Sequence, residues 1–236
     1  MPAVSGSMDT GMGVGGAPPP PPPAEKPEWW ASSAVVGLMG FGTTTMVAGL
    51  TNLPTPYSQG FGGNWVVYGM AIFFGGLAQL IAGVIALRKG NLFAGSAFMG
   101  YGAFWLAYWQ LAGSLNAALG SATPGPAALY GVAGFAFIWM LFTFSFMINS
   151  IKHGWGITFV FVFLFISFAL LVAKYWSLAA NLGGCTDATD LCGPFAFNAA
   201  ANWIVGGIII FTGFVAWYVA TAQLTEWNYG RKVLPH

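Results

Sequence analysis

Charged residues are scarce in this sequence. Only 6% of the 236 residues are Asp, Glu, Lys or Arg, while 57% are hydrophobic; soluble domains contain about 25% charged residues. Three intervals, 29–87, 90–151 and 191–225, contain no charged residue at all. The first two are each longer than one membrane span of about 20 residues, and each contains a proline-bearing turn. Composition therefore indicates an integral membrane protein, and the formal net charge of +1 gives no reason to expect a nucleic-acid partner.

The apolar intervals also lack the residue types that carry catalysis. No Ser–His–Asp, zinc-ligand or phosphate-loop arrangement is present. The carboxylates and histidines fall outside the expected spans or at their edges: Asp9, Glu25, Glu28, Asp187, Asp190, Glu226, His153 and His236. We therefore expect a protein that is not an enzyme and that has no cofactor and no metal site.

The sequence has only two cysteines, Cys185 and Cys192, in the segment between the last two expected spans. We expect this loop to face the outside, where thiols oxidise, which favours a local disulfide; free thiols are the alternative. A metal site would need more ligands than these cysteines and the intervening Asp187 and Asp190 supply.

What the sequence does contain is a series of long apolar segments. They predict an all-α integral membrane protein with about six transmembrane helices, at 32–51, 65–87, 92–115, 127–150, 155–176 and 199–224. With six spans, the basic residues fall on one side except Lys174, so both termini are expected to be cytoplasmic. The residues on that side are Lys26, Arg88, Lys89, Lys152, Arg231 and Lys232.

The domain organisation follows from the same pattern. Residues 1–28 are Gly- and Pro-rich, include six consecutive prolines, and predict a disordered cytoplasmic tail. Residues 29–228 form the six-helix transmembrane domain, and residues 229–236 form a short cytoplasmic C-terminal tail.

The stretch 73–105 predicts a hairpin of two apolar helices joined by a basic turn. Gly75, Gly76, Gln79 and Gly83 share one face of its first helix, which is nearly smooth and carries one amide. A lone Gln in a membrane helix faces either a wet path or a neighbouring helix, and both interpretations stay open for Gln79.

Several motifs occur in a recognisable order: GLMGFGTTT at 37–45, then FGGLAQLIAG, RKGNLF and YGAFW within the hairpin, and YGRKVLP at 229–235. Together they resemble the acetate uptake transporter family, or succinate–acetate permeases, which has fungal acetate- and ammonia-linked relatives. The likeness spans residues 32–235. It departs at Ser32–Leu38, where the family's Asn-Pro-Ala-Pro-Leu-Gly-Leu is replaced by SSAVVGL, which puts substrate range and affinity in question.

The resemblance implies a homo-oligomer, a homohexamer in the family, in which each six-helix subunit has a central pore. It places the pore constriction at Phe41, Tyr101 and Leu164; ordinary helix packing is the alternative for all three. The substrate pathway is assigned to further residues: Gln79, Thr44, Ser33 and Trp105. Lys174 either draws anions to the outer mouth or, as we favour from sequence, snorkels toward the interface.

The function implied is movement of acetate or a similar short monocarboxylate across the plasma membrane. Because the spans hold no carboxylate relay, coupled protons are expected to travel on the substrate; symporter and anion channel both remain open. One alternative is an ammonium or ammonia channel. Another is a non-transporting structural membrane protein whose proline-rich tail recruits a soluble partner.

Overall fold

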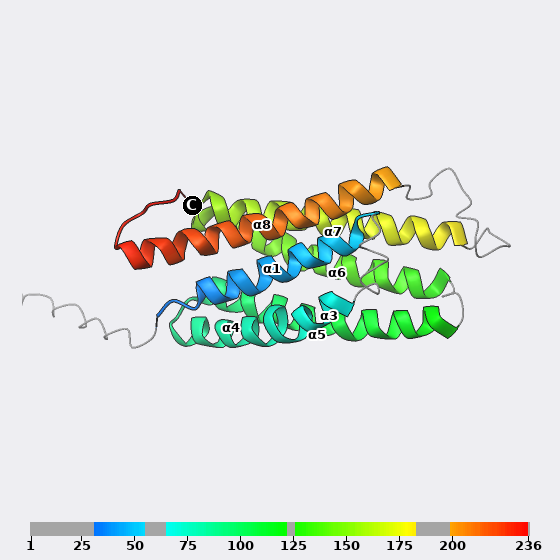
Figure 1. Ribbon diagram of the computed structural model, residues 1–236, viewed down its shortest axis with the longest axis horizontal. Coiled ribbons are helices and arrows are strands. Elements are labelled where there is room, and N and C mark those ends of the chain that lie inside the picture. The colour runs from blue at the N-terminus through cyan, green and yellow to red at the C-terminus, as the bar shows by residue number, and fades with distance from the viewer. Residues whose placement is uncertain (1–30, 55–64, 122–125, 183–198, 236) are drawn as a thin grey trace, which may run out of the picture. The chain divides into compact units, whose positions relative to one another are not determined.

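The structure is a computed structural model that describes residues 31–54, 65–121, 126–182 and 199–235. Within these ranges the chain is helical apart from short turns and ends, and no strand occurs there (Figure 1). The predicted tail at residues 1–28 and the predicted disulfide between Cys185 and Cys192 lie outside the described residues.

Each of the six predicted spans overlaps a helical segment. The segments are α1 (Ala34–Asn52), the continuous run α3 (Trp65–Ile72), η1 (Phe73–Ala78) and α4 (Gln79–Arg88), α5 (Leu92–Ser121), α6 (Pro126–Ser150), α7 (Trp155–Leu182) and α8 (Ala199–Tyr229). A short 3₁₀ turn, η2 (Ile151–His153), joins α6 to α7. The helices α5 and α7 continue six residues past their predicted ends, and α8 continues five.

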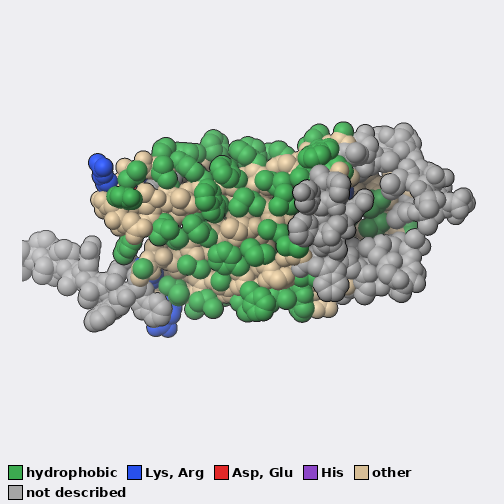
Figure 2. Space-filling model, in the orientation of Figure 1, with side chains coloured by type: hydrophobic (Ala, Val, Ile, Leu, Met, Phe, Trp, Pro, Cys, Tyr) green, Lys and Arg blue, Asp and Glu red, His purple; other side chains and the backbone are tan. Residues whose placement is uncertain are grey.

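Five of these segments are long and apolar enough to cross a membrane: Ala34–Asn52, Val66–Arg88, Pro126–His153, Trp155–Asn181 and Ala200–Tyr229. The helix α5 is not among the five, because its Gly, Tyr, Trp and Gln residues lower its hydropathy. Hydrophobic side chains cover much of the face shown in Figure 2. Large hydrophobic residues are exposed in the structure, among them Phe73 and Ile138, which are 68% and 62% exposed. An apolar exterior of this kind is expected for helices that contact lipid.

Paired glycines bring α1 and α8 close together. A Cβ atom added to Gly42 would lie 2.6 Å from the carbonyl oxygen of Gly213, and one added to Gly213 would lie 2.5 Å from that of Gly42. Gly206 approaches Gly49 in the same way, whereas Gly207 has no neighbour within 4 Å. On α8, Gly206 and Gly213 therefore pack against α1 within the chain, as small residues do where helices approach closely.

A π-helical turn, η1, interrupts the segment between α3 and α4. It contains Gly75 and Gly76, which pack against side chains of α1 and α5. Added Cβ atoms there would meet Thr44 and Trp105 from Gly75, and Leu106 from Gly76. The smooth face expected from the sequence is thus a packing face, and Gln79 begins the α-helix directly after the π-turn.

The basic residues gather at one end of the helices. The His153 ring stacks on Phe93 near the start of α5, with ring centroids 4.0 Å apart, so the α6–α7 turn lies beside the α4–α5 turn. That end carries Arg88, Lys89, Lys152, Arg231 and Lys232, and Figure 2 shows Lys and Arg side chains there. Lys174 lies at the opposite end, where it contacts the last residue of α1.

Candidate functional site: two cavities that meet at three residues

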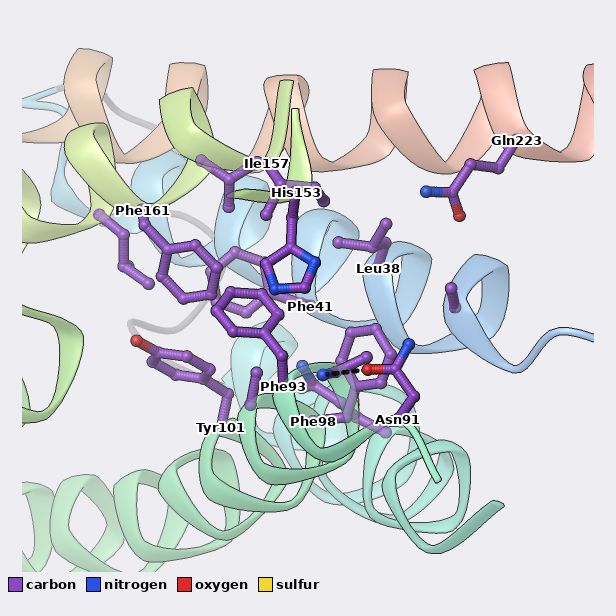
Figure 3. Close-up of a pocket in the computed structure, with 16 residues that line it drawn as sticks. Leu38, Phe41, Asn91, Phe93, Phe98, Tyr101, His153, Ile157, Phe161 and Gln223 are labelled. Carbon is purple, nitrogen blue, oxygen red and sulfur yellow. Dashed lines mark hydrogen bonds between the residues drawn. The ribbon is translucent and has the colours of Figure 1, made fainter. Parts of the chain in front are cut away.

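A first cavity of about 160 Å³ opens near the basic end of the helices. Figure 3 shows Asn91 and Gln223 on one side of it and Phe41 and Tyr101 on the other. Most of its wall is apolar. The lining residues are Ala34, Leu38, Phe41, Gln79, Asn91, Phe93, Ala94, Ala97, Phe98, Tyr101, His153, Ile157, Val160, Phe161, Leu164 and Gln223.

Three polar residues of this cavity were not predicted: Asn91, His153 and Gln223. Asn91 immediately precedes α5, where its Oδ1 accepts a hydrogen bond from the Ala94 N–H at 2.9 Å. His153 stacks on Phe93 (Figure 3) and also borders a surface hollow that includes Lys152. The turn motif RKGN was the available signal for Asn91, since Asn favours the residue before a helix. His153 and Gln223 reach the cavity only through the packing of η2 and α8, for which the sequence carries no motif.

Gln79 is the most deeply buried polar group of the first cavity, with 1% of its surface exposed. Its side-chain oxygen Oε1 has no hydrogen-bond partner among the described residues. A buried acceptor left unpaired costs about 1–3 kcal/mol. An amide held in this way beside a cavity is available to a solute that can donate a hydrogen bond.

A second cavity of about 80 Å³ lies toward the other end of the helices. Its wall is also largely apolar and aromatic. The lining residues are Phe41, Thr45, Ala48, Asn52, Tyr101, Phe104, Trp105, Tyr108, Leu111, Val132, Phe135, Ala136, Leu164, Ser167, Phe168, Leu171, Tyr175 and Ile209.

The Thr and Ser hydroxyl groups of this second wall donate to backbone carbonyl groups. Thr45 donates to Phe41 O at 2.7 Å and Ser167 donates to Phe163 O at 2.8 Å, as Thr and Ser commonly do within membrane helices. The indole Nε1 of Trp105 is buried without a partner among the described residues. Among the described lining residues, the second cavity thus has a buried donor without a partner, where the first has a buried acceptor without one.

Phe41, Tyr101 and Leu164 are the three residues common to both linings. They come from α1, α5 and α7, and each is at most 5% exposed. The ring centroids of Phe41 and Tyr101 are 5.4 Å apart. The three side chains thus lie where the first cavity meets the second.

The Tyr101 hydroxyl lies 2.9 Å from Oγ1 of Thr143 on α6. Thr143 in turn donates its one hydroxyl proton to Trp139 O at 2.7 Å. Because a threonine hydroxyl has a single proton, Tyr101 is the donor in its bond to Thr143. The Tyr101 oxygen therefore keeps its capacity to accept a hydrogen bond at the junction of the cavities.

Of the remaining residues predicted for the substrate pathway, one lines a cavity and two do not. Trp105 lines the second cavity. Thr44 is fully buried, lies 3.5 Å from Met70 O, and lines neither cavity. Ser33 precedes α1, makes no side-chain cap bond and also lines neither cavity. Within the described ranges, no group of three or more His, Cys, Asp or Glu residues is arranged to hold a metal ion.

Helices with an apolar exterior that enclose two interior cavities define a multi-pass helical membrane protein. The chain belongs to the GPR1/FUN34/yaaH family, whose sequence pattern matches residues 15–230. The family resemblance drawn from the sequence motifs is thereby confirmed.

Similar proteins include a transporter, a solved channel and a yeast protein. The chain is 33% identical to the succinate-acetate/proton symporter SatP of Escherichia coli over 202 residues, which is 86% of this chain and 93% of the relative. It matches the structure of the bacterial acetate channel SatP with a TM-score of 0.70 and 30% identity, covering 87% of this chain and 98% of that one. It is 32% identical to ammonia transport outward protein 2 of Saccharomyces cerevisiae, over 81% of this chain and 60% of that relative.

Proposed function

We propose that this chain moves acetate or a similar short monocarboxylate across the cell membrane, along a path through the two cavities. The observation that carries the proposal is that Phe41, Tyr101 and Leu164 line both cavities, so a solute that passes between them must pass these side chains. The substrate class is supported by the similarity to relatives named as a succinate-acetate/proton symporter and an acetate channel.

The chemistry of the walls suits such a solute. A methyl group tolerates an apolar wall, and two carboxyl oxygens need only a few polar partners. An uncompensated anion is costly in a medium of low dielectric constant, whereas protonated acetic acid carries no charge to desolvate. Neutral pores select through hydroxyls, amides and apolar constrictions, which are the groups present along this path.

Proton coupling follows from the polar group at the constriction. Tyr101 donates its proton to Thr143 and retains an acceptor oxygen, so its preferred partner is a solute that brings a proton of its own. The neutral acid satisfies that requirement and the anion does not. Protons therefore cross with the substrate as its carboxylic acid, and the protein needs no carboxylate relay of its own.

The architecture that accompanies this function has six crossings, with α5 as the sixth, and a pore in each subunit. The basic end of the helices faces the cytoplasm, with both termini there, in keeping with the bias of Lys and Arg toward that side. The protein resides in the plasma membrane as a homo-oligomer, a hexamer by analogy with the family. It acts as a transporter or channel and not as an enzyme.

Ammonium or ammonia movement is the second candidate. The similarity to a yeast protein named for outward ammonia transport favours it. Phe41 and Tyr101 present two aromatic rings 5.4 Å apart, and aromatic faces attract small cations. The interior cavities suit an uncharged ammonia molecule equally well in size.

Competition between the two solutes tests the proposal. We expect purified protein in lipid vesicles to take up labelled acetate above the leak of protein-free vesicles, and excess propionate to reduce that uptake while methylammonium leaves it unchanged. Uptake of labelled methylammonium that acetate does not inhibit, together with acetate entry no faster than the leak, would assign the chain to the ammonium function.

A further inference from the structure

Lys174 is a charged side chain within an otherwise uncharged candidate membrane span. It lies in α7, seven residues before the end of the candidate span Trp155–Asn181. Ionisable residues in such positions are costly and commonly mark a solute pathway. The sequence alone favoured a lysine that snorkels toward the membrane surface, but its partner in the structure lies on another helix of the same chain.

The ammonium of Lys174 donates a hydrogen bond to Oδ1 of Asn52 at 2.9 Å. The Asn52 amide is itself fixed, because its Nδ2 donates to Ala48 O at 2.9 Å. This second bond turns the amide oxygen toward α7 and gives the lysine a defined position. One of the three ammonium N–H groups is used by Asn52, which leaves two donors for a ligand.

The Lys174–Asn52 pair lies at the end of the second cavity. Asn52 and Tyr175 both line that cavity, and the Lys174 Nζ lies 5.9 Å from the centre of the Tyr175 ring. Lys174 is not itself a lining residue; its ammonium is joined to the cavity wall by its hydrogen bond to Asn52. Along α1, Asn52 is 11 residues from Phe41, which places the pair roughly 16 Å from the constriction at 1.5 Å per residue.

The charge distribution makes this position distinctive. Arg88, Lys89, Lys152, Arg231 and Lys232 occupy the opposite end of the helices. Among the described residues the one carboxylate is Glu226, which lies near the C-terminal end of α8, also away from Lys174. At the end of the second cavity, the described residues therefore present a positive charge that no described acid offsets.

We propose that Lys174, positioned by Asn52, is the binding site for the carboxylate group of a short monocarboxylate entering the second cavity. The ammonium supplies the charge and two hydrogen-bond donors, while Leu171 and Phe168 supply an apolar wall for the alkyl end. The proposal rests on the monocarboxylate transport function proposed above and adds the residue that concentrates the anion at this mouth. The anion takes up a proton from bulk water there and passes Tyr101 as the neutral acid. Without Lys174 the path remains, but the local concentration of anion at its end falls.

The test compares three variants of the full chain in lipid vesicles at pH 7.5, measured as labelled acetate uptake over a range of concentrations. Lys174→Met removes the charge and keeps most of the length, Lys174→Arg keeps the charge, and Lys232→Met removes a charge at the exposed C-terminal segment. We expect Lys174→Met to raise the half-saturating concentration about tenfold, equivalent to about 1.4 kcal/mol, with maximal flux within about twofold of wild type. Lys174→Arg and Lys232→Met should keep a half-saturating concentration near that of wild type.

The proposal can also be tested on the wild-type protein, and this second test does not depend on whether Lys174→Met folds. Acetate uptake should be inhibited by the propionate anion at concentrations about tenfold lower than by propionamide, a neutral molecule of nearly the same size. Equal inhibition by the two would overturn the proposal, as would a Lys174→Met variant with wild-type half-saturation. If the wild type takes up acetate and only the Lys174 effect is missing, this inference alone fails. If the wild type takes up no acetate, the proposed function fails and this inference with it.

Discussion

The rings of Phe41 and Tyr101 lie with centroids 5.4 Å apart and planes inclined by 60°, at the point where two interior cavities meet. They come from different helices and lie 60 positions apart in the sequence. Leu164 completes the set from a third helix. The arrangement of the three side chains therefore depends on how α1, α5 and α7 are assembled, and the passage that we propose between the cavities runs past them.

Shortening Leu164 should widen this passage. In the variant Leu164→Ala we expect propionate and butyrate uptake to rise relative to acetate uptake, because a smaller side chain leaves room for a longer alkyl group. The variant should also lose about 2 kcal/mol of stability as buried contacts disappear. Leu129→Ala is the matched control, since Leu129 is 3% exposed and lines neither cavity. An unchanged preference among the three acids in Leu164→Ala would place the constriction elsewhere.

Replacement of Gln79 should separate solute binding from stability. The oxygen Oε1 has no partner among the described residues, so Gln79→Met removes an unpaired acceptor that costs about 1–3 kcal/mol. We expect thermal stability in detergent to stay the same or increase, while the half-saturating acetate concentration rises. A less stable protein with unchanged acetate uptake would show that Gln79 serves helix packing instead.

The bond between Tyr101 and Thr143 predicts a mild phenotype for the loss of the tyrosine hydroxyl. Tyr101→Phe keeps the ring at the constriction and should retain acetate uptake, with a loss of about 1 kcal/mol of stability. Adding Thr143→Val should cost less in this background than in the wild type, because the two groups act as a pair. Complete loss of uptake in Tyr101→Phe would contradict this expectation and would mean that the solute cannot pass without the Tyr101 hydroxyl.

The glycine contact between α1 and α8 should be intolerant of any side chain. Gly213→Ala places a Cβ atom 2.5 Å from the carbonyl oxygen of Gly42, so the helices must separate. We expect a loss of about 1–3 kcal/mol, measured as a lower thermal transition of the purified protein. Gly207→Ala is the control on the same helix, because nothing lies within 4 Å of the added atom. Equal stability of the two variants would contradict the observed packing of these helices.

The positions of the helices could be predicted from the sequence because long apolar intervals separated by turn residues leave few other arrangements. The ends were less accurate. In α5, α7 and α8 the helix continues past the apolar core through residues that favour helix, such as the Ala–Ala–Asn–Leu end of α7. The π-turn η1 was not predicted, because its two glycines give the same small-residue pattern in an ordinary helix.

The site was predictable only where motifs identified it. Phe41, Tyr101 and Leu164 were assigned through family motifs, and their role as a constriction stays a prediction. The sequence does not show which of the three consecutive threonines of α1 faces a cavity. Successive residues of a helix point about 100° apart, so the answer depends on how the neighbouring helices pack. In the structure Thr45 lines the second cavity, whereas Thr44 packs against α3 and η1. Thr143, 42 positions from Tyr101, had no sequence signal at all.

The most direct test of the central claim is labelled acetate uptake into proteoliposomes under separate gradients. Wild type and Tyr101→Ala would be compared with no gradient, with a pH gradient and with a membrane potential. If the substrate crosses with its own proton, wild-type uptake should exceed that of protein-free vesicles, follow the pH gradient and ignore the potential, and Tyr101→Ala should alter its rate. Uptake driven by the potential alone would contradict proton-linked movement, and uptake no greater than the lipid leak would contradict acetate transport itself.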